Sequence, residues 1–69
     1  MTMQIETPFI KLDSLLKFAN EAESGGDAKV MVQSGLVRVN GEVCTQRGRK
    51  IYPGDTVFVN NTEIKVETQ

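Results

Sequence analysis

Five basic side chains in the middle of the chain are the groups best suited to bind a ligand. Residues 29–50 hold these five and a single Glu, a net charge of +4, although the whole chain has a net charge of −1. Arginine matches two phosphate oxygens at once with its planar fork of donors, and lysine adds a mobile point charge. The pattern therefore favours phosphate as the ligand, and the five side chains are Lys29, Arg38, Arg47, Arg49 and Lys50.

The sequence contains few side chains that could catalyse a reaction or bind a metal ion. Histidine is absent and Cys44 is the only cysteine, so the chain has no Cys/His pair, no catalytic triad and no cluster of metal ligands. Asp13, Asp27 and Asp55 stand where helix caps or turns would explain them. We therefore expect no enzyme, no metal ion and no other cofactor, and we expect Cys44 to fill a small space in the core.

The length of the chain allows one domain. A chain of 69 residues buries about 60% of its unfolded surface and cannot divide into two cores, so we expect a single domain over residues 1–69. Its apolar runs are far shorter than the roughly 20 residues that cross a bilayer, and no basic stretch precedes an apolar block at its N-terminus. With one cysteine and no internal disulfide, the sequence predicts a cytoplasmic protein that is not bound to membranes.

Apolar spacing predicts one strand and two helices in the first half of the chain. Apolar and polar residues alternate over residues 1–6, which is typical of a short half-buried strand. Leucines at intervals of three and four predict a helix that begins at about Lys11 and fades near residues 20–22. Ser24 is suited to cap a second helix over residues 25–34, which ends before a glycine that can adopt a left-handed conformation.

The second half of the chain predicts short strands joined by tight turns. Asn40-Gly41 is the strongest hairpin signal and places Arg38 opposite Val43. Pro53-Gly54 and Asn60-Asn61 predict two further turns. The predicted architecture is therefore α+β, with two short helices packed on a small curved antiparallel sheet.

Four short motifs follow one another along the chain: Lys11–Asp13, the basic residue Lys29, Gly35–Gly41 with the sequence Gly-Leu-Val-Arg-Val-Asn-Gly, and the Pro-Gly-Asp turn at Pro53–Asp55. Each motif alone is weak, but four in one order and spacing are much more specific. Together they resemble the S-four RNA-binding domain, also called the αL motif and named after small-subunit ribosomal protein four. The resemblance covers about residues 10–60.

Two finer features resemble a smaller group within that family. Gly25-Gly26 before the second helix and the loop Thr45–Lys50 look like the small stand-alone bacterial proteins of the YaaA and YbcJ type. One position departs from the family pattern. Many members have Ser-Arg where this chain has Gly26-Asp27, so Lys29 must serve in place of the missing arginine.

The resemblance implies that the two helices and the following hairpin present a basic surface to RNA. Lys29 would then bring a phosphate near the positive N-terminal end of the second helix. We expect most of the four aromatic residues to lie in the core, which favours structured RNA, ribosomal or transfer RNA, over a single strand read by stacking. Stand-alone members also suggest an association with the ribosomal particle, and we expect a monomer. The predicted contacts are Lys11, Lys29, Arg38, Asn40, Arg47, Arg49 and Lys50.

Two other interpretations of the sequence stay open. A basic loop is often only a solvated turn, and Arg38 is more often an exposed strand residue than a ligand group. Val-Asn-Gly-Glu followed by Gly-Asp-Thr-Val also occurs in ubiquitin-like sulfur carriers, so a small protein-interaction or ubiquitin-like module without a nucleic-acid role is the alternative. Such carriers expose a C-terminal Gly-Gly, whereas this chain ends in Glu67-Thr68-Gln69.

Overall fold

Two helices and seven short strands make up the domain. In the computed structural model, which describes residues 1–69, both helices come between the second and third strands. The strands are β1 (Thr2–Ile5), β2 (Ile10–Lys11), β3 (Val37–Val39), β4 (Glu42–Val43), β5 (Lys50–Ile51), β6 (Thr56–Val59) and β7 (Thr62–Thr68), and the helices are α1 (Leu12–Phe18) and α2 (Gly25–Gln33).

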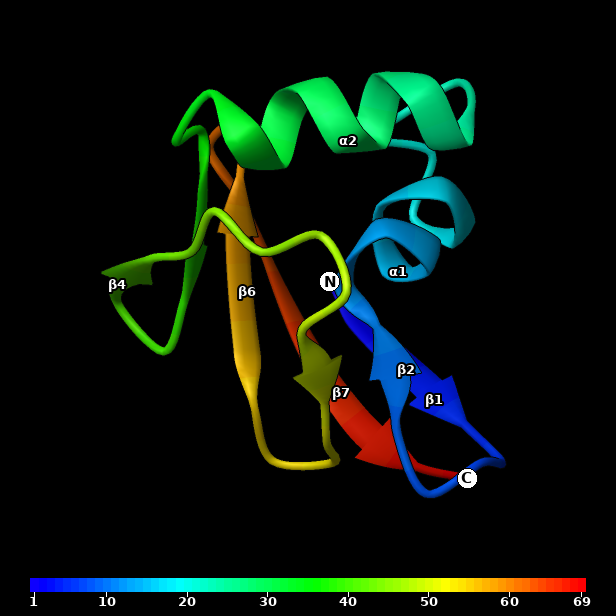
Figure 1. The fold of residues 1–69 in the computed structure, drawn as a ribbon. Coiled ribbons are helices and arrows are strands. Elements are labelled where there is room, and N and C mark those ends of the chain that lie inside the picture. The colour runs from blue at the N-terminus through cyan, green and yellow to red at the C-terminus, as the bar shows by residue number, and fades with distance from the viewer.

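Five of the strands form one sheet, and the other two form a separate ladder. The sheet has the order β1-β7-β6-β3-β4, and β2 pairs with β5 outside it. In Figure 1, α2 lies across the upper end of the sheet, and α1 lies below α2, next to β2. Every second residue of the inner strands is buried in one core cluster with the leucines of α1 and with Ala28 and Val32 of α2. These strand residues are Val37, Val39, Val57, Val59, Ile64 and Val66.

The predicted α+β architecture with two helices on a sheet is confirmed, but the sheet is mixed rather than antiparallel. β1 runs parallel to β7, with Met3 opposite Val66, whereas the other neighbouring strands of this sheet are antiparallel. Alternation of residues 1–6 predicts a strand but not its direction. Tight turns reveal antiparallel neighbours that follow each other in sequence, and β1 and β7 lie at opposite ends of the chain.

Both helices form close to the predicted residues. α1 ends at Phe18, a little earlier than expected, because Asn20 has a left-handed φ of 59°. α2 begins after Ser24, whose Oγ accepts a hydrogen bond from the Asp27 N–H at 3.2 Å, so the predicted cap is confirmed. Gly35 has a φ of 78°, as predicted for the residue that ends this helix. Neither helix has the length and apolarity that a membrane span requires.

The predicted tight turns are also confirmed. Asn40-Gly41 has φ angles of 52° and 87°, as a type I′ hairpin turn requires, and Arg38 lies opposite Val43. Asn60-Asn61, with φ angles of 51° and 61°, joins β6 to β7 in the same way. Cys44 is buried, as expected for a small core residue.

The side chain of Asn40 ties the first hairpin turn to the later Pro-Gly-Asp turn. Its Oδ1 accepts a hydrogen bond from the Thr56 N–H at 2.9 Å, and its Nδ2 donates to Asp55 Oδ1 at 3.1 Å. The second carboxylate oxygen of Asp55 accepts a hydrogen bond from the Tyr52 N–H at 2.9 Å. Two of the four sequence motifs therefore form one hydrogen-bonded unit.

Replacement of Asn40 with alanine is expected to destabilise the fold by about 1–3 kcal/mol, because alanine loses both hydrogen bonds and is strained at a positive φ. Glycine tolerates this φ, so Asn40→Gly should lose only the hydrogen bonds, at a cost of about 1 kcal/mol. Urea unfolding followed by circular dichroism measures both changes. Wild-type stability of Asn40→Gly would show that the hydrogen bonds do not stabilise the fold.

The expectation that most aromatic side chains lie in the core is wrong. Phe18, Tyr52 and Phe58 are 74%, 48% and 42% exposed, and Phe9 is half-buried. Phe58 lies between two buried valines of β6, so strand alternation turns its ring to the outer face of the sheet. The protein therefore has aromatic surface that is open to a partner.

Candidate nucleic-acid interface

Four of the seven predicted contact residues come together at one edge of the molecule. Lys11 of β2 lies opposite Lys50 of β5 in the two-stranded ladder, and Arg47 and Arg49 stand in the segment that leads into β5. Figure 1 shows this segment passing from β4 toward the start of α1 before it enters β5. We call Lys11, Arg47, Arg49 and Lys50 the basic edge.

Backbone hydrogen bonds attach the basic edge to the start of α1. The Leu12 N–H donates to the Arg49 carbonyl at 2.9 Å, and the Asp13 N–H donates to the Arg47 carbonyl at 3.0 Å. The first amides of a helix have no partner within the helix, and the side chain of Lys11, at the cap position of α1, does not bond to them. The Arg47 and Arg49 carbonyls accept their hydrogen bonds instead. The loop is therefore held by its backbone, and the Arg47 and Arg49 side chains make no hydrogen bond that holds it.

The basic edge is exposed and not neutralised within the protein. All four of its side chains are exposed, and none of the side-chain hydrogen bonds in the structure has a Lys or Arg donor. One aromatic contact is present, in which Lys50 Nζ lies 4.9 Å from the centroid of the Phe9 ring. Adjacent positive charges without partners raise the local potential and favour an anionic ligand with several charges.

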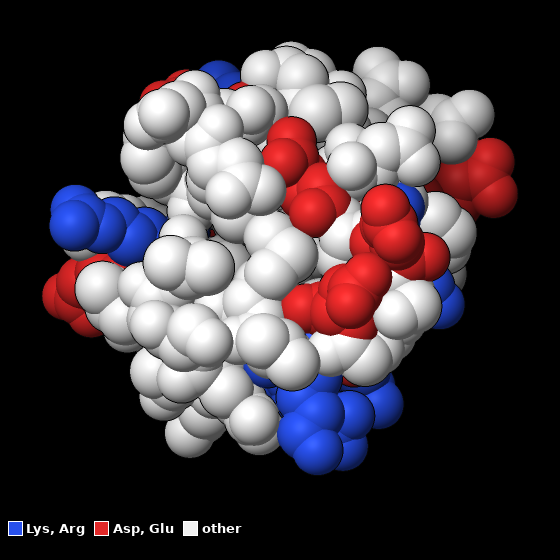
Figure 2. Space-filling model, turned by 90° about the horizontal axis from the view of Figure 1, so that it is seen from above, with Lys and Arg blue, Asp and Glu red and all other residues white.

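Arg38 and Lys29 come from other elements of the fold. Arg38 is exposed on β3, on the outer face of the sheet, with Val43 and Phe58 as its neighbours across the strands. Lys29 is exposed on α2. Figure 2, seen from above α2, shows a large group of Lys and Arg side chains at the lower edge and separate basic side chains at the left, upper left and right. On that face the cations do not form one continuous surface.

The first turn of α2 lies in acidic surroundings. A hollow of about 330 Å³ beside it is lined by Glu21, Glu23 and Asp27 together with three apolar residues. Figure 2 also shows acidic side chains grouped to the right of the centre of this face. A phosphate would be repelled by these carboxylates, so the geometry gives no electrostatic support to a phosphate held by Lys29 at the start of α2.

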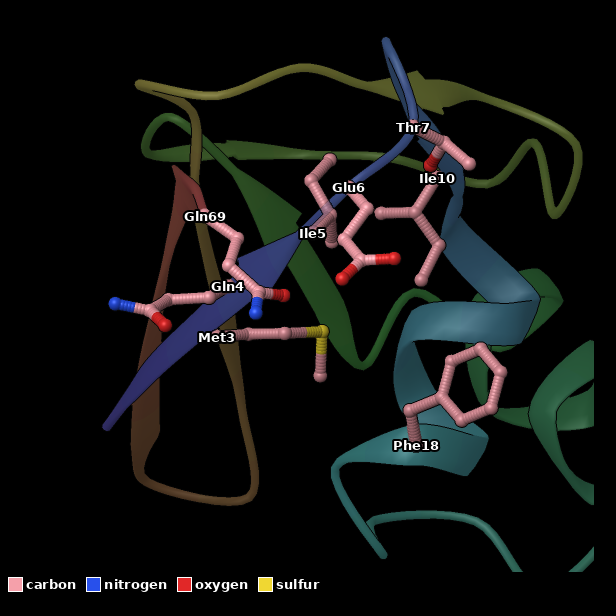
Figure 3. A pocket seen from close by; sticks show the side chains of 8 residues that line it. All are labelled: Met3, Gln4, Ile5, Glu6, Thr7, Ile10, Phe18 and Gln69. Atoms are coloured by element: carbon pink, nitrogen blue, oxygen red, sulfur yellow. The ribbon is translucent and has the colours of Figure 1, made fainter.

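The largest hollow in the surface does not suit an anion either. It has a volume of about 440 Å³, and Glu6 is the only charged residue that lines it. Figure 3 shows the Phe18 side chain of α1 on one side of this hollow and Met3 of β1 on the other. No group of three or more Cys, Asp or Glu side chains lies close enough together to hold a metal ion.

Two aromatic residues beside the basic edge were missed in the sequence. The Phe9 and Tyr52 rings have centroids 5.8 Å apart and planes inclined at 50°, and Tyr52 directly follows β5. A signal for Tyr52 was present, because Ile51 is apolar and its two neighbours in an extended segment must point the other way. Lys50 and Tyr52 are indeed exposed on either side of the buried Ile51.

Comparison with known proteins gives one consistent family. A family model described as the S4 domain matches residues 3–67. A protein of Bacillus subtilis named as a probable ribosome maturation protein, RlbA, is 44% identical over 57 residues, which are 83% of this chain and 80% of that protein. YbcJ of Escherichia coli, named as a candidate RNA-binding protein, is 37% identical over 59 residues, which are 86% of this chain and 84% of YbcJ.

A solved structure has the same arrangement of helices and strands. The solution structure of YbcJ from Escherichia coli matches with a TM-score of 0.72 and 34% sequence identity, over 96% of this chain and 85% of that chain. It is described as revealing an αL motif involved in RNA-binding. The two helices packed on a mixed sheet agree with that fold.

Proposed function

Because this chain belongs to the S4 domain family, as its motifs predicted, we propose that it binds structured RNA, ribosomal or transfer RNA, through phosphate contacts at the basic edge. The observation that carries the proposal is the exposure of Lys11, Arg47, Arg49 and Lys50 on one edge whose backbone is fixed to α1. The αL motif of YbcJ, described as involved in RNA-binding, supports the same activity. The proposal contains no catalytic step.

The uneven charge of the protein explains how an acidic chain binds a polyanion. The net charge is −1, so the protein as a whole does not attract RNA electrostatically. Glu21, Glu23 and Asp27 repel it from the start of α2, whereas the basic edge attracts it. Arginine forks and lysine charges can grip the backbone of a folded RNA without reading its sequence.

The three other predicted contacts are secondary in this proposal. Arg38 and Lys29 lie on β3 and α2, outside the basic edge. Arg38 adds a phosphate contact where a larger RNA reaches across the sheet, and Lys29 adds a weaker one, because carboxylates line the hollow beside the first turn of α2. The side-chain amide of Asn40 already bonds to Thr56 and Asp55. Asn40 therefore contributes to binding by holding the two turns together.

Binding to structured RNA is expected to weaken steeply with salt. If the four cations of the basic edge each neutralise one phosphate, log affinity falls with log salt at a slope of about −3.6 on paired RNA, or about −2.8 on single strands. This corresponds to a loss of about 150-fold on paired RNA between roughly 50 and 200 mM salt. Fluorescence anisotropy of a labelled hairpin RNA measures the slope. An affinity that does not change with salt would exclude phosphate contacts as the basis of binding.

We further propose that the RNA belongs to a ribosomal particle and that the protein binds it as a monomer. The support for the ribosomal particle is the similarity to RlbA, which is named as a probable ribosome maturation protein. A tagged protein should sediment with ribosomal particles through a sucrose gradient at low salt and should be released at high salt. Sedimentation at the top of the gradient at low salt would contradict ribosome association and would leave RNA binding to be judged by the anisotropy experiment.

A further inference from the structure

An exposed aromatic ring is held in a fixed position beside the basic edge. Tyr52 is 48% exposed and packs against Phe9, with 5.8 Å between the ring centroids. Ile51 before it is fully buried, and the Tyr52 N–H donates to Asp55 Oδ2 at 2.9 Å. Pro53 after it restricts the Tyr52 backbone to extended conformations. The ring is therefore presented by a rigid backbone and needs little ordering when a partner binds.

The other exposed aromatic rings have different surroundings. Phe18 lies at the far end of α1, beside the apolar hollow that contains Glu6 (Figure 3). Phe58 lies between Arg38 and Glu63 on the outer face of the sheet, so a carboxylate and a single cation flank it. Only the Phe9 and Tyr52 pair has a cation in contact, because Lys50 Nζ lies 4.9 Å from the Phe9 centroid. An aromatic pair and several cations thus meet at the basic edge.

We infer that Tyr52 stacks on an unpaired base of the bound RNA while Lys50 and the neighbouring arginines hold the phosphates beside that base. The inference rests on the proposed RNA binding and deepens it, because it requires an RNA in which an unpaired nucleotide adjoins a paired segment. A nucleotide offers the aromatic face of its base together with a phosphate a few ångströms away, which matches this combination of groups. An apolar peptide would leave the cations without partners.

The test compares two RNAs that differ in one feature. One is a short duplex with an unpaired adenine overhang, and the other is the same duplex with flush ends. Tyr52 is the only tyrosine and the protein has no tryptophan, so intrinsic tyrosine emission reports on this ring alone. The overhang duplex should quench that emission and should bind about tenfold more tightly than the flush duplex.

Variants separate stacking from other effects. Tyr52→Ala should remove the tenfold preference for the overhang, and Tyr52→Phe should keep it. Phe18→Ala, which removes a more exposed ring elsewhere, should not change it. Stacking would be refuted if wild-type and Tyr52→Ala protein bind both RNAs equally and with the same salt sensitivity, and if neither RNA changes the tyrosine emission of the wild type. The phosphate contacts would then still stand. Failure of both RNAs to bind would instead refute the proposed RNA binding, and the inference with it.

Discussion

Replacement of Arg47, Arg49 and Lys50 together with serine is expected to lower the affinity for structured RNA by about 10-fold to 100-fold, taking up to about 1 kcal/mol for each exposed charge contact. The salt slope should become shallower by about 1 for each cation removed. The loss should be similar for RNAs of different sequence, because phosphate contacts carry no base information. Anisotropy titrations of several hairpin RNAs over a range of salt concentrations measure both effects.

The fold should survive this triple replacement. The segment is held by its backbone, through the Arg47 and Arg49 carbonyls that accept hydrogen bonds from the first amides of α1, and serine keeps these carbonyls. Removal of adjacent like charges also relieves repulsion. Unfolding in urea should therefore give a stability equal to that of the wild type, so that a loss of affinity cannot be attributed to unfolding.

A matched pair of double variants distinguishes the basic edge from net charge. Arg47→Ser with Arg49→Ser removes two positive charges from the edge, and Lys17→Ser with Lys65→Ser removes two from the end of α1 and from β7. Only the first pair should weaken binding strongly. If both pairs weaken binding equally, the RNA responds to total charge, and the basic edge is not the binding surface.

Local chemistry made much of the fold predictable from sequence. The Asn-Gly and Asn-Asn turns fixed two hairpins because both residues of each turn adopt a positive φ, and apolar spacing located both helices to within a few residues. The pairing of β1 with β7 was not predictable in this way. It joins the two ends of the chain in parallel, and no turn or periodicity records which distant strands meet.

The candidate site was predictable only in part, for a similar reason. Arg47, Arg49 and Lys50 are adjacent in sequence and so were easily grouped. The position of Lys11 opposite Lys50 depends on the ladder of β2 and β5, which is two residues long on each side and too short for a recognisable pattern. The acidic hollow beside α2 was not predicted for a related reason, because counting charges along the sequence does not show which residues share a surface.

The ladder of β2 and β5 also predicts a large effect of a single substitution on stability. Ile51 has no exposed surface and lies opposite Ile10, so Ile51→Ala should cost about 2–5 kcal/mol through lost apolar burial and the cavity left behind. The total free energy of unfolding of a domain of this length is about 3–10 kcal/mol. The variant should therefore be close to unfolding at room temperature, which urea titration followed by circular dichroism would show.

Ile51 links this stability to the proposed function, because it stands between the exposed Lys50 and Tyr52. Partial loss of its packing should loosen both neighbours, so RNA affinity should fall even in the fraction of Ile51→Ala molecules that remain folded. Ile51→Val, which removes one methylene group, should cost only about 0.5–1.5 kcal/mol and should keep the affinity. A loss of less than about 1 kcal/mol in Ile51→Ala would mean that the core closes around the smaller side chain, and β5 would then not be the rigid support that presents Lys50 and Tyr52.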